Sequence, residues 1–80
     1  EWRRLLAAFR RFGPGALVVE GAGGVHVPLA GRRDVIDFME ALQLPVIVVA
    51  RAGLGTLNHV TLTVNAVRGR GLRVGAVVLN

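Results

Sequence analysis

Residues 44–80, LPVIVVARAGLGTLNHVTLTVNAVRGRGLRVGAVVLN, decide the fold class of this chain. Residues 46–50 and 74–79 are short apolar runs, and such runs are typical of strands that are buried on both faces of a parallel sheet. Between them we expect a helix that begins with Thr56 as its cap and runs to about Arg68. Its apolar residues recur at helical spacing and are expected to face inward: Leu57, Val60, Val64 and Val67.

The first half of the chain continues this alternation. Residues 1–12 have the apolar spacing of a helix, and Gly-Pro-Gly at residues 13–15 is expected to end it. Residues 16–19 predict a further strand buried on both faces, and residues 21–33 a glycine-rich loop. A second helix is expected from a cap at Asp34, with its apolar residues buried: Val35, Ile36, Met39 and Leu42. Helices that alternate with apolar strands predict an α/β fold with a parallel sheet and right-handed crossovers.

The composition excludes several classes of protein. The longest uncharged apolar run, LQLPVIVVA, is much shorter than the ~20 residues that a membrane span needs, so no membrane segment is expected. The absence of cysteine excludes disulfides and thiolate metal sites, and we expect a cytoplasmic protein. The net charge is +5, but the basic residues, all arginines, are scattered along the chain. We therefore interpret them as solvated helix ends and loops and expect no nucleic-acid partner.

Ligands of open α/β sheets bind beyond the carboxyl ends of the strands, which places residues 20–24, residues 51–58 and Asn80 at a candidate site. Glu20 ends an apolar run that is expected to be buried, and Mg²⁺ commonly takes one or two carboxylates together with phosphate oxygens. The glycines that follow leave backbone N–H groups open to a phosphate. The alternative is a Glu that pairs with an arginine beside a flexible loop.

Two other segments at this edge have a possible chemical role. Residues 51–58 lead into a helix whose N-terminus could receive a carboxylate or phosphate, or they could simply turn the chain. The amide of Asn80 could match a purine edge, or it could form a turn after the strand. His59 is expected to pack or cap within the helix, and His26 has no evident partner in the sequence.

Three blocks, VVEGAGGVHVPL, LPVIVVARAGLGTLNH with TLTVNAVRGRGL, and VGAVVLN, together resemble the central part of the dethiobiotin synthetase family. The likeness runs from about Ala16 to Asn80, and ARAGLGTLNH is its discriminating part. The resemblance implies a P-loop NTPase fold, a Rossmann-like three-layer α/β/α domain that works as a homodimer. The family is an ATP-dependent cyclo-ligase of biotin biosynthesis. CO₂ adds to an amine of 7,8-diaminononanoate, ATP phosphorylates the carbamate, and the second amine displaces phosphate to close the ring.

The resemblance also implies roles for individual residues. Glu20 matches the Mg²⁺-binding glutamate of the family, and Asn80 matches the asparagine that reads adenine. The segment lining the nucleotide phosphates corresponds to Gly21, Ala22 and Gly23. The helix start that receives the substrate carboxylate, contributed across the dimer, corresponds to Leu54, Gly55, Thr56, Leu57 and Asn58.

The chain departs from the family pattern in what it lacks. The family needs a Walker A loop with its lysine, a second lysine in the substrate site and a further acidic metal ligand, whereas none of the 80 residues is lysine. His26 also stands where the family pattern leads us to expect an aromatic or aliphatic residue. We therefore expect residues 1–80 to be an internal fragment of one synthetase-like domain, with half of a site and no catalytic residue of its own.

Two alternatives share parts of this pattern. A cobyrinate-type glutamine amidotransferase has a similar ATP-binding half, but it needs a C-terminal glutaminase domain with a catalytic cysteine. A P-loop partitioning or regulatory ATPase would couple nucleotide to a surface partner. It is expected to have a different strand-end motif in place of EGAGG.

Overall fold

The computed structural model of the chain describes residues 1–13 and 15–80. These residues form two compact units, Glu1–Ala41 and Leu42–Asn80, and each unit is described by itself. Pro14, which belongs to the predicted helix stop, lies outside the described residues.

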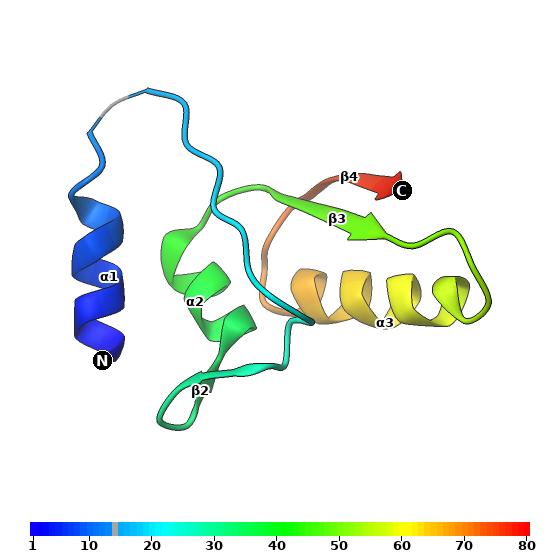
Figure 1. The fold of residues 1–80 in the computed structure, drawn as a ribbon, viewed down its shortest axis with the longest axis horizontal. Helices are drawn as coiled ribbons and strands as arrows, with labels where there is room; N and C mark the ends of the chain where they lie inside the picture. The colour runs from blue at the N-terminus through cyan, green and yellow to red at the C-terminus, as the bar shows by residue number, and fades with distance from the viewer. Residues whose placement is uncertain (14) are drawn as a thin grey trace. The chain divides into compact units, whose positions relative to one another are not determined.

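The second unit is a strand–helix–strand arrangement. It contains β3 (Val46–Ala50), α3 (Thr56–Gly69) and β4 (Val74–Leu79). The two strands are parallel neighbours, with Ala50 opposite Leu79 at their carboxyl ends, and α3 lies along one face of the pair (Figure 1). The α/β fold and the bounds of both strands predicted from the sequence are confirmed. A parallel pair requires a crossover connection, which α3 provides.

The core of the second unit lies between α3 and the sheet. Its buried side chains are Val48, Val67 and Leu72, and Val67 is completely buried. The prediction that Leu57 faces inward is wrong, because its side chain is 86% exposed. Leu57 stands in the first turn of α3, next to the exposed loop residues 51–55, and none of the described residues covers it.

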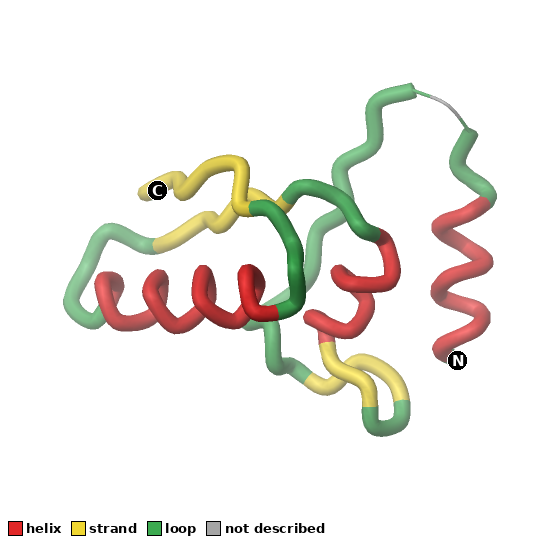
Figure 2. Tube along the Cα trace, turned by 180° about the vertical axis from the view of Figure 1, so that it is seen from behind, coloured by secondary structure: helices red, strands yellow, loops and turns green. Residues whose placement is uncertain are grey.

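The first unit is built from two helices and a short hairpin. Its elements are α1 (Trp2–Arg10), β1 (Pro28–Ala30), β2 (Arg33–Asp34) and α2 (Val35–Leu42). Trp2 of α1 contacts Phe38 of α2 edge to face, with 6.1 Å between ring centroids, and the guanidinium of Arg33 stacks over Trp2 at 4.6 Å. The antiparallel hairpin leads directly into α2 (Figure 2). These contacts join α1 to the hairpin and to α2, and Ile36 of α2 is buried.

The predicted strand at residues 16–19 is not formed. This segment has no regular secondary structure, and Leu17, Val18 and Val19 are 39%, 91% and 42% exposed. A strand is maintained by hydrogen bonds to a neighbouring strand, and the described sheets contain only the pairs β1–β2 and β3–β4. Apolar composition alone therefore did not define a strand here. The loop predicted for residues 21–33 likewise needs correction, because it contains β1 and the first residue of β2.

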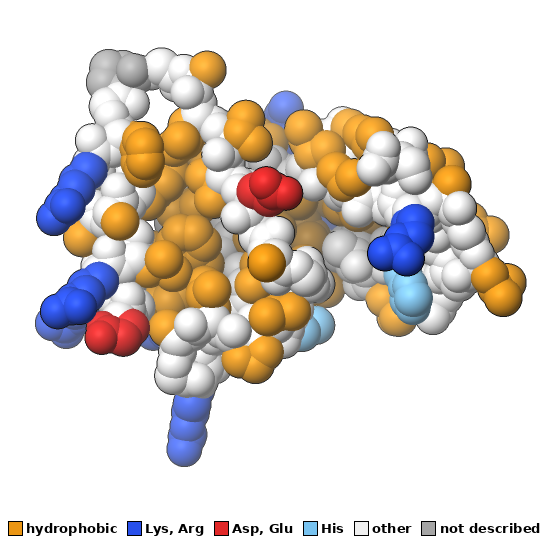
Figure 3. Space-filling model, in the orientation of Figure 1, with side chains coloured by type: hydrophobic (Ala, Val, Ile, Leu, Met, Phe, Trp, Pro, Cys, Tyr) orange, Lys and Arg blue, Asp and Glu red, His pale blue; other side chains and the backbone are white. Residues whose placement is uncertain are grey.

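Apolar side chains reach the surface in both units (Figure 3). In the second unit, Ile47 and Val49 of β3 are 63% and 66% exposed, whereas Val48 between them is buried. Because side chains alternate along a strand, this pattern means that only one face of the sheet is covered within the unit. None of the helices in the described part of the chain combines the length and the apolar character needed to cross a membrane.

Candidate functional site

The carboxyl ends of β3 and β4 bring two of the predicted segments together. The backbone N–H of Asn80 donates to the carbonyl of Ala50 over 2.8 Å, and the N–H of Ala52 donates to the carbonyl of Asn80 over 3.4 Å. The loop after β3 and the residue after β4 therefore lie side by side, as expected for a site at this edge of a parallel sheet.

The loop after β3 closes tightly before it enters α3. Gly55 caps the helix in a left-handed conformation, with a φ of 88°, which a residue with a side chain adopts only at a cost. Thr56 is therefore the first residue of the helix. The prediction from the sequence that Thr56 is the cap is wrong. Its hydroxyl donates to the carbonyl of Arg51, and its N–H donates to the carbonyl of Gly53 over 3.2 Å. The hydroxyl thus stabilises the loop, and no side chain of the described residues caps the helix.

The start of α3 is open. Gly55, Leu57 and Asn58 are exposed, and Leu54 is fully exposed. His59 is also exposed, its N–H donates to the carbonyl of Gly55 over 3.0 Å, and its ring lies 3.7 Å from the position that a Cβ on Gly55 would occupy. The first turn of a helix carries unpaired N–H groups and the positive end of the dipole, which suit an anionic group.

The glycine segment after Glu20 belongs to the first unit and is described without reference to the sheet edge. Glu20 is exposed, so the predicted burial of its carboxylate is wrong. The reason is that residues 16–19, which were expected to bury it, form no strand. Its ionised form therefore does not carry the desolvation cost that a buried site would impose.

The glycine segment itself leaves little room for side chains. A Cβ on Gly21 would lie 3.3 Å from Cγ1 of Val35, and a Cβ on Gly23 would lie 2.8 Å from Cγ2 of Val27. Gly23 also has a φ of 81°. Gly24, in contrast, has open space where a Cβ would stand. An exposed carboxylate followed by three glycines and one alanine fits a Mg²⁺–phosphate group.

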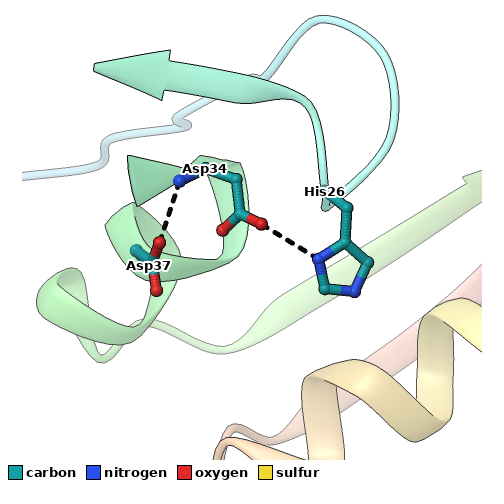
Figure 4. A network of polar contacts seen from close by, with 3 residues as sticks. All are labelled: His26, Asp34 and Asp37. Atoms are coloured by element: carbon teal, nitrogen blue, oxygen red, sulfur yellow. Dashed lines mark hydrogen bonds and ion pairs between the residues drawn. The ribbon is translucent and has the colours of Figure 1, made fainter. Parts of the chain in front are cut away.

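Residues 25–27 attach this segment to the start of α2. The carbonyls of Val25 and Val27 accept hydrogen bonds from the N–H groups of Ile36 (2.8 Å) and Val35 (3.0 Å). Between them, Nδ1 of His26 lies 3.0 Å from Oδ2 of Asp34 (Figure 4). No partner for His26 is evident from the sequence, because the hairpin that brings Asp34 close to it was not predicted.

The cap of α2 also differs from the expectation. The side chain of Asp34 pairs with His26 and was expected to cap the helix. Instead, the carboxylate of Asp37 accepts a hydrogen bond of 2.8 Å from the N–H of Asp34, which is one half of a capping box (Figure 4). The beginning of this helix next to Asp34 and the burial of Ile36 are confirmed, whereas Val35, Met39 and Leu42 are only partly buried.

A metal ion would need ligands beyond those that the described residues bring together. Among the described residues, no group of three or more His, Asp or Glu side chains is arranged to hold a metal. Glu20 could therefore supply one ligand at most. This fits Mg²⁺, which usually keeps waters and phosphate oxygens in its coordination shell.

These features define an α/β protein with an open carboxyl edge and a glycine segment suited to phosphate. The family model described as "AAA domain" matches residues 13–80. The chain belongs to this family, which is one of P-loop domains.

Curated relatives match the same part of the chain. The ATP-dependent dethiobiotin synthetase BioD of Anaeromyxobacter sp. (strain K) is 62% identical over 65 residues, covering 81% of this chain and 29% of the relative. The protein of the same name from Haloferax mediterranei is 53% identical over 74 residues, 92% of this chain and 31% of the relative. The biotin biosynthesis bifunctional protein BioCD of Bordetella avium is 50% identical over 64 residues, 80% of this chain and 14% of the relative.

The chain spans about a third of the length of the BioD relatives it matches. Because these relatives are 53–62% identical over the matched residues, the resemblance to the dethiobiotin synthetases is confirmed for this segment. No solved structure matches the chain significantly.

Proposed function

We propose that this chain is a segment of an ATP-dependent dethiobiotin synthetase, an enzyme that closes a cyclic urea on 7,8-diaminononanoate with CO₂. The observation that carries the proposal is the identity of 62% over 65 residues to a relative of that name. The names of the relatives favour this function over a cobyrinate-type amidotransferase or a partitioning ATPase.

In this proposal the glycine segment receives the phosphates of the nucleotide. Glu20, which is exposed, donates one carboxylate to Mg²⁺, and Gly21, Ala22 and Gly23 present backbone N–H groups to phosphate oxygens. ATP with Mg²⁺ supplies the phosphoryl group that activates the substrate. The tight fit of Gly21 and Gly23 against Val35 and Val27 supports this role, because it keeps the backbone in one shape without side chains.

In the same proposal, the carboxyl edge of the β3–β4 pair receives the carboxylate of the substrate and the adenine of the nucleotide. The start of α3 and the two residues before it, residues 54–58, bind the substrate carboxylate through N–H groups and the positive end of the helix dipole. Asn80 contacts the adenine through its amide. The hydrogen bonds that Asn80 makes with Ala50 and with Ala52, in the loop before this helix start, support a shared edge. We propose that the substrate site is completed across a homodimer in the cytoplasm.

The segment supplies part of a site and belongs to a single synthetase domain. No lysine is present in its 80 residues, so the phosphate-binding lysine of a Walker A loop must come from elsewhere in the protein. We therefore expect the isolated segment to be inactive and the full-length protein to be active.

The test is an assay of both with 7,8-diaminononanoate, bicarbonate and MgATP, followed by mass spectrometry of the product. Dethiobiotin and stoichiometric ADP are expected from the full-length protein only. A full-length protein that hydrolyses ATP but forms no dethiobiotin would refute the proposed function, and product from the isolated segment would refute the division of the site.

A further inference from the structure

His26 and Asp34 form the one side-chain bond in a row of three contacts between residues 25–27 and residues 34–36. Backbone hydrogen bonds of 2.8 and 3.0 Å lie on either side of the 3.0 Å contact between Nδ1 and Oδ2. Figure 4 shows the imidazole and the carboxylate directed toward each other. The loop is thus joined to the start of α2 by both main chain and side chains.

This row of contacts continues directly into the glycine segment. The N–H of Val27 donates to the carbonyl of Gly24 over 3.2 Å, and the side chain of Val27 limits the space at Gly23. At the other end, Gly21 lies against Val35, the first residue of α2. Residues 25–27 are therefore in contact with the start of α2 on one side and with Gly23 and Gly24 on the other, and they connect the two.

Asp34 is suited to hold the loop because it is itself fixed. Its N–H donates to the carboxylate of Asp37 over 2.8 Å. Only 24% of its side chain is exposed, and its Oδ1 is buried without a hydrogen-bond partner among the described residues. His26, which is 66% exposed, is therefore the described hydrogen-bond partner of this carboxylate, and losing it would leave a half-buried charge unsatisfied.

We propose that His26 and Asp34 are positioning residues, which hold the glycine segment in the shape that receives the nucleotide phosphates. This inference rests on the proposed function, since it assigns the segment to MgATP. Neither residue needs to touch the nucleotide. The pair acts by limiting the conformations of residues 21–24 before binding, which reduces the entropy lost when the ligand is bound.

The geometry of the pair supplies a discriminating set of variants. Nδ2 of asparagine stands at the same distance along the side chain as Nδ1 of histidine, whereas glutamine places its amide one carbon further out. His26→Asn should therefore keep the bond to Asp34, and His26→Gln and His26→Leu should lose it. The variants are made in the full-length protein, and their folding is checked by circular dichroism and thermal melting.

For His26→Leu and His26→Gln we expect the KM for MgATP to rise about three- to tenfold, as for the loss of one hydrogen bond. The KM for the diamine should not change, and His26→Asn should behave as the wild type. A purely structural role would lower the fraction of active enzyme and leave both KM values unchanged. An unchanged KM for MgATP in His26→Leu, or equal behaviour of the asparagine and glutamine variants, would overturn the proposal.

A second measurement does not depend on activity. Backbone amides of residues 21–27 should exchange with deuterium faster in His26→Leu than in the wild type and in His26→Asn. In an Asp34→Ala background, His26→Leu should add no further exchange, because the bond is already lost. Additive effects of the two substitutions on the exchange rates would refute the proposal that His26 and Asp34 act together. A wild-type protein that forms no dethiobiotin would refute the proposed function while leaving this exchange result standing.

Discussion

The backbone N–H of Asn80 donates to the carbonyl of Ala50 across the carboxyl ends of β4 and β3, over 2.8 Å. Its carbonyl in turn accepts from Ala52 in the loop that leads to α3. Asn80 is thus fixed by its main chain, and its side chain is free to take part in recognition without being needed for the fold. Substitution at this position should therefore separate binding from stability.

Asn80→Ala in the full-length protein should raise the KM for ATP by about three- to tenfold, as for the loss of one neutral hydrogen bond to the base. The kcat should change less, because the adenine is distant from the transferred phosphate. Steady-state kinetics with ATP as the varied substrate checks this, and the melting temperature should stay within a few degrees of the wild type. Equal use of ATP before and after the change would contradict the adenine assignment.

Glu20→Gln should preserve the fold, because the side chain is exposed and leaves no buried group behind. It removes one negative ligand from the proposed Mg²⁺ site, so turnover should fall by about 10²- to 10³-fold at limiting Mg²⁺, and less when Mg²⁺ is in excess. Titration of activity with MgCl₂ at fixed ATP checks the shift. Unchanged turnover at limiting Mg²⁺ would remove Glu20 from the site.

Gly23→Ala should weaken binding of MgATP more than Gly24→Ala, although the two glycines are adjacent. A methyl group on Gly23 would lie 2.8 Å from Cγ2 of Val27, and the φ of 81° disfavours any side chain. Holding alanine in this left-handed conformation should cost about 1–2 kcal/mol, and the free energy of nucleotide binding should weaken by a similar amount. A methyl group on Gly24 would meet no atom of the described residues within 4 Å, so Gly24→Ala is the matched control. Calorimetric titration with an unhydrolysable ATP analogue checks the difference, and equal affinities would contradict a shape-selective segment.

The sequence predicted the second unit much better than the first. The parallel pair at residues 46–50 and 74–79 and the helix between them were correctly placed, because strand, helix and strand follow one another along the chain and each strand has its partner within the unit. Residues 16–19 were equally apolar but did not form a strand, because a strand also depends on a partner that local composition does not supply.

The site followed the same division. Residues 51–58 and Asn80 were correctly placed together, since parallel strands end at the same edge. The burial of Glu20 was predicted wrongly, because it depended on the strand that is not formed. The pairing of His26 with Asp34 was missed, since it depends on a short hairpin whose two strands have only three and two residues. Contacts made across an irregular loop have no periodic signal in the sequence.

Thr56→Val should loosen the loop before α3 while the side chain at residue 56 keeps nearly the same shape. The valine has nearly the volume of threonine but cannot donate to the carbonyl of Arg51, so the loop before the helix loses its side-chain bond. A modest cost of about 1 kcal/mol is expected, together with a higher KM for the diamine and an unchanged KM for ATP. Thr61→Val, an exposed position within the same helix, is the control and should change neither KM. A rise in the KM for ATP alone would contradict the assignment of this helix start to the substrate.

Val67→Ala should destabilise the protein more than any of the site variants, because the side chain of Val67, on α3, is completely buried. The lost methyl groups and the remaining cavity should cost about 1–3 kcal/mol, partly offset by the better helix propensity of alanine. Leu62→Ala removes a larger side chain from the same helix, but that side chain is 59% exposed, so its effect should be below about 1 kcal/mol. Urea unfolding followed by circular dichroism compares the two in the full-length protein. If Leu62→Ala proved the more destabilising change, the exposed face of α3 would have to be covered in the full-length protein, and the core described between α3 and the β3–β4 pair would be only one part of its packing.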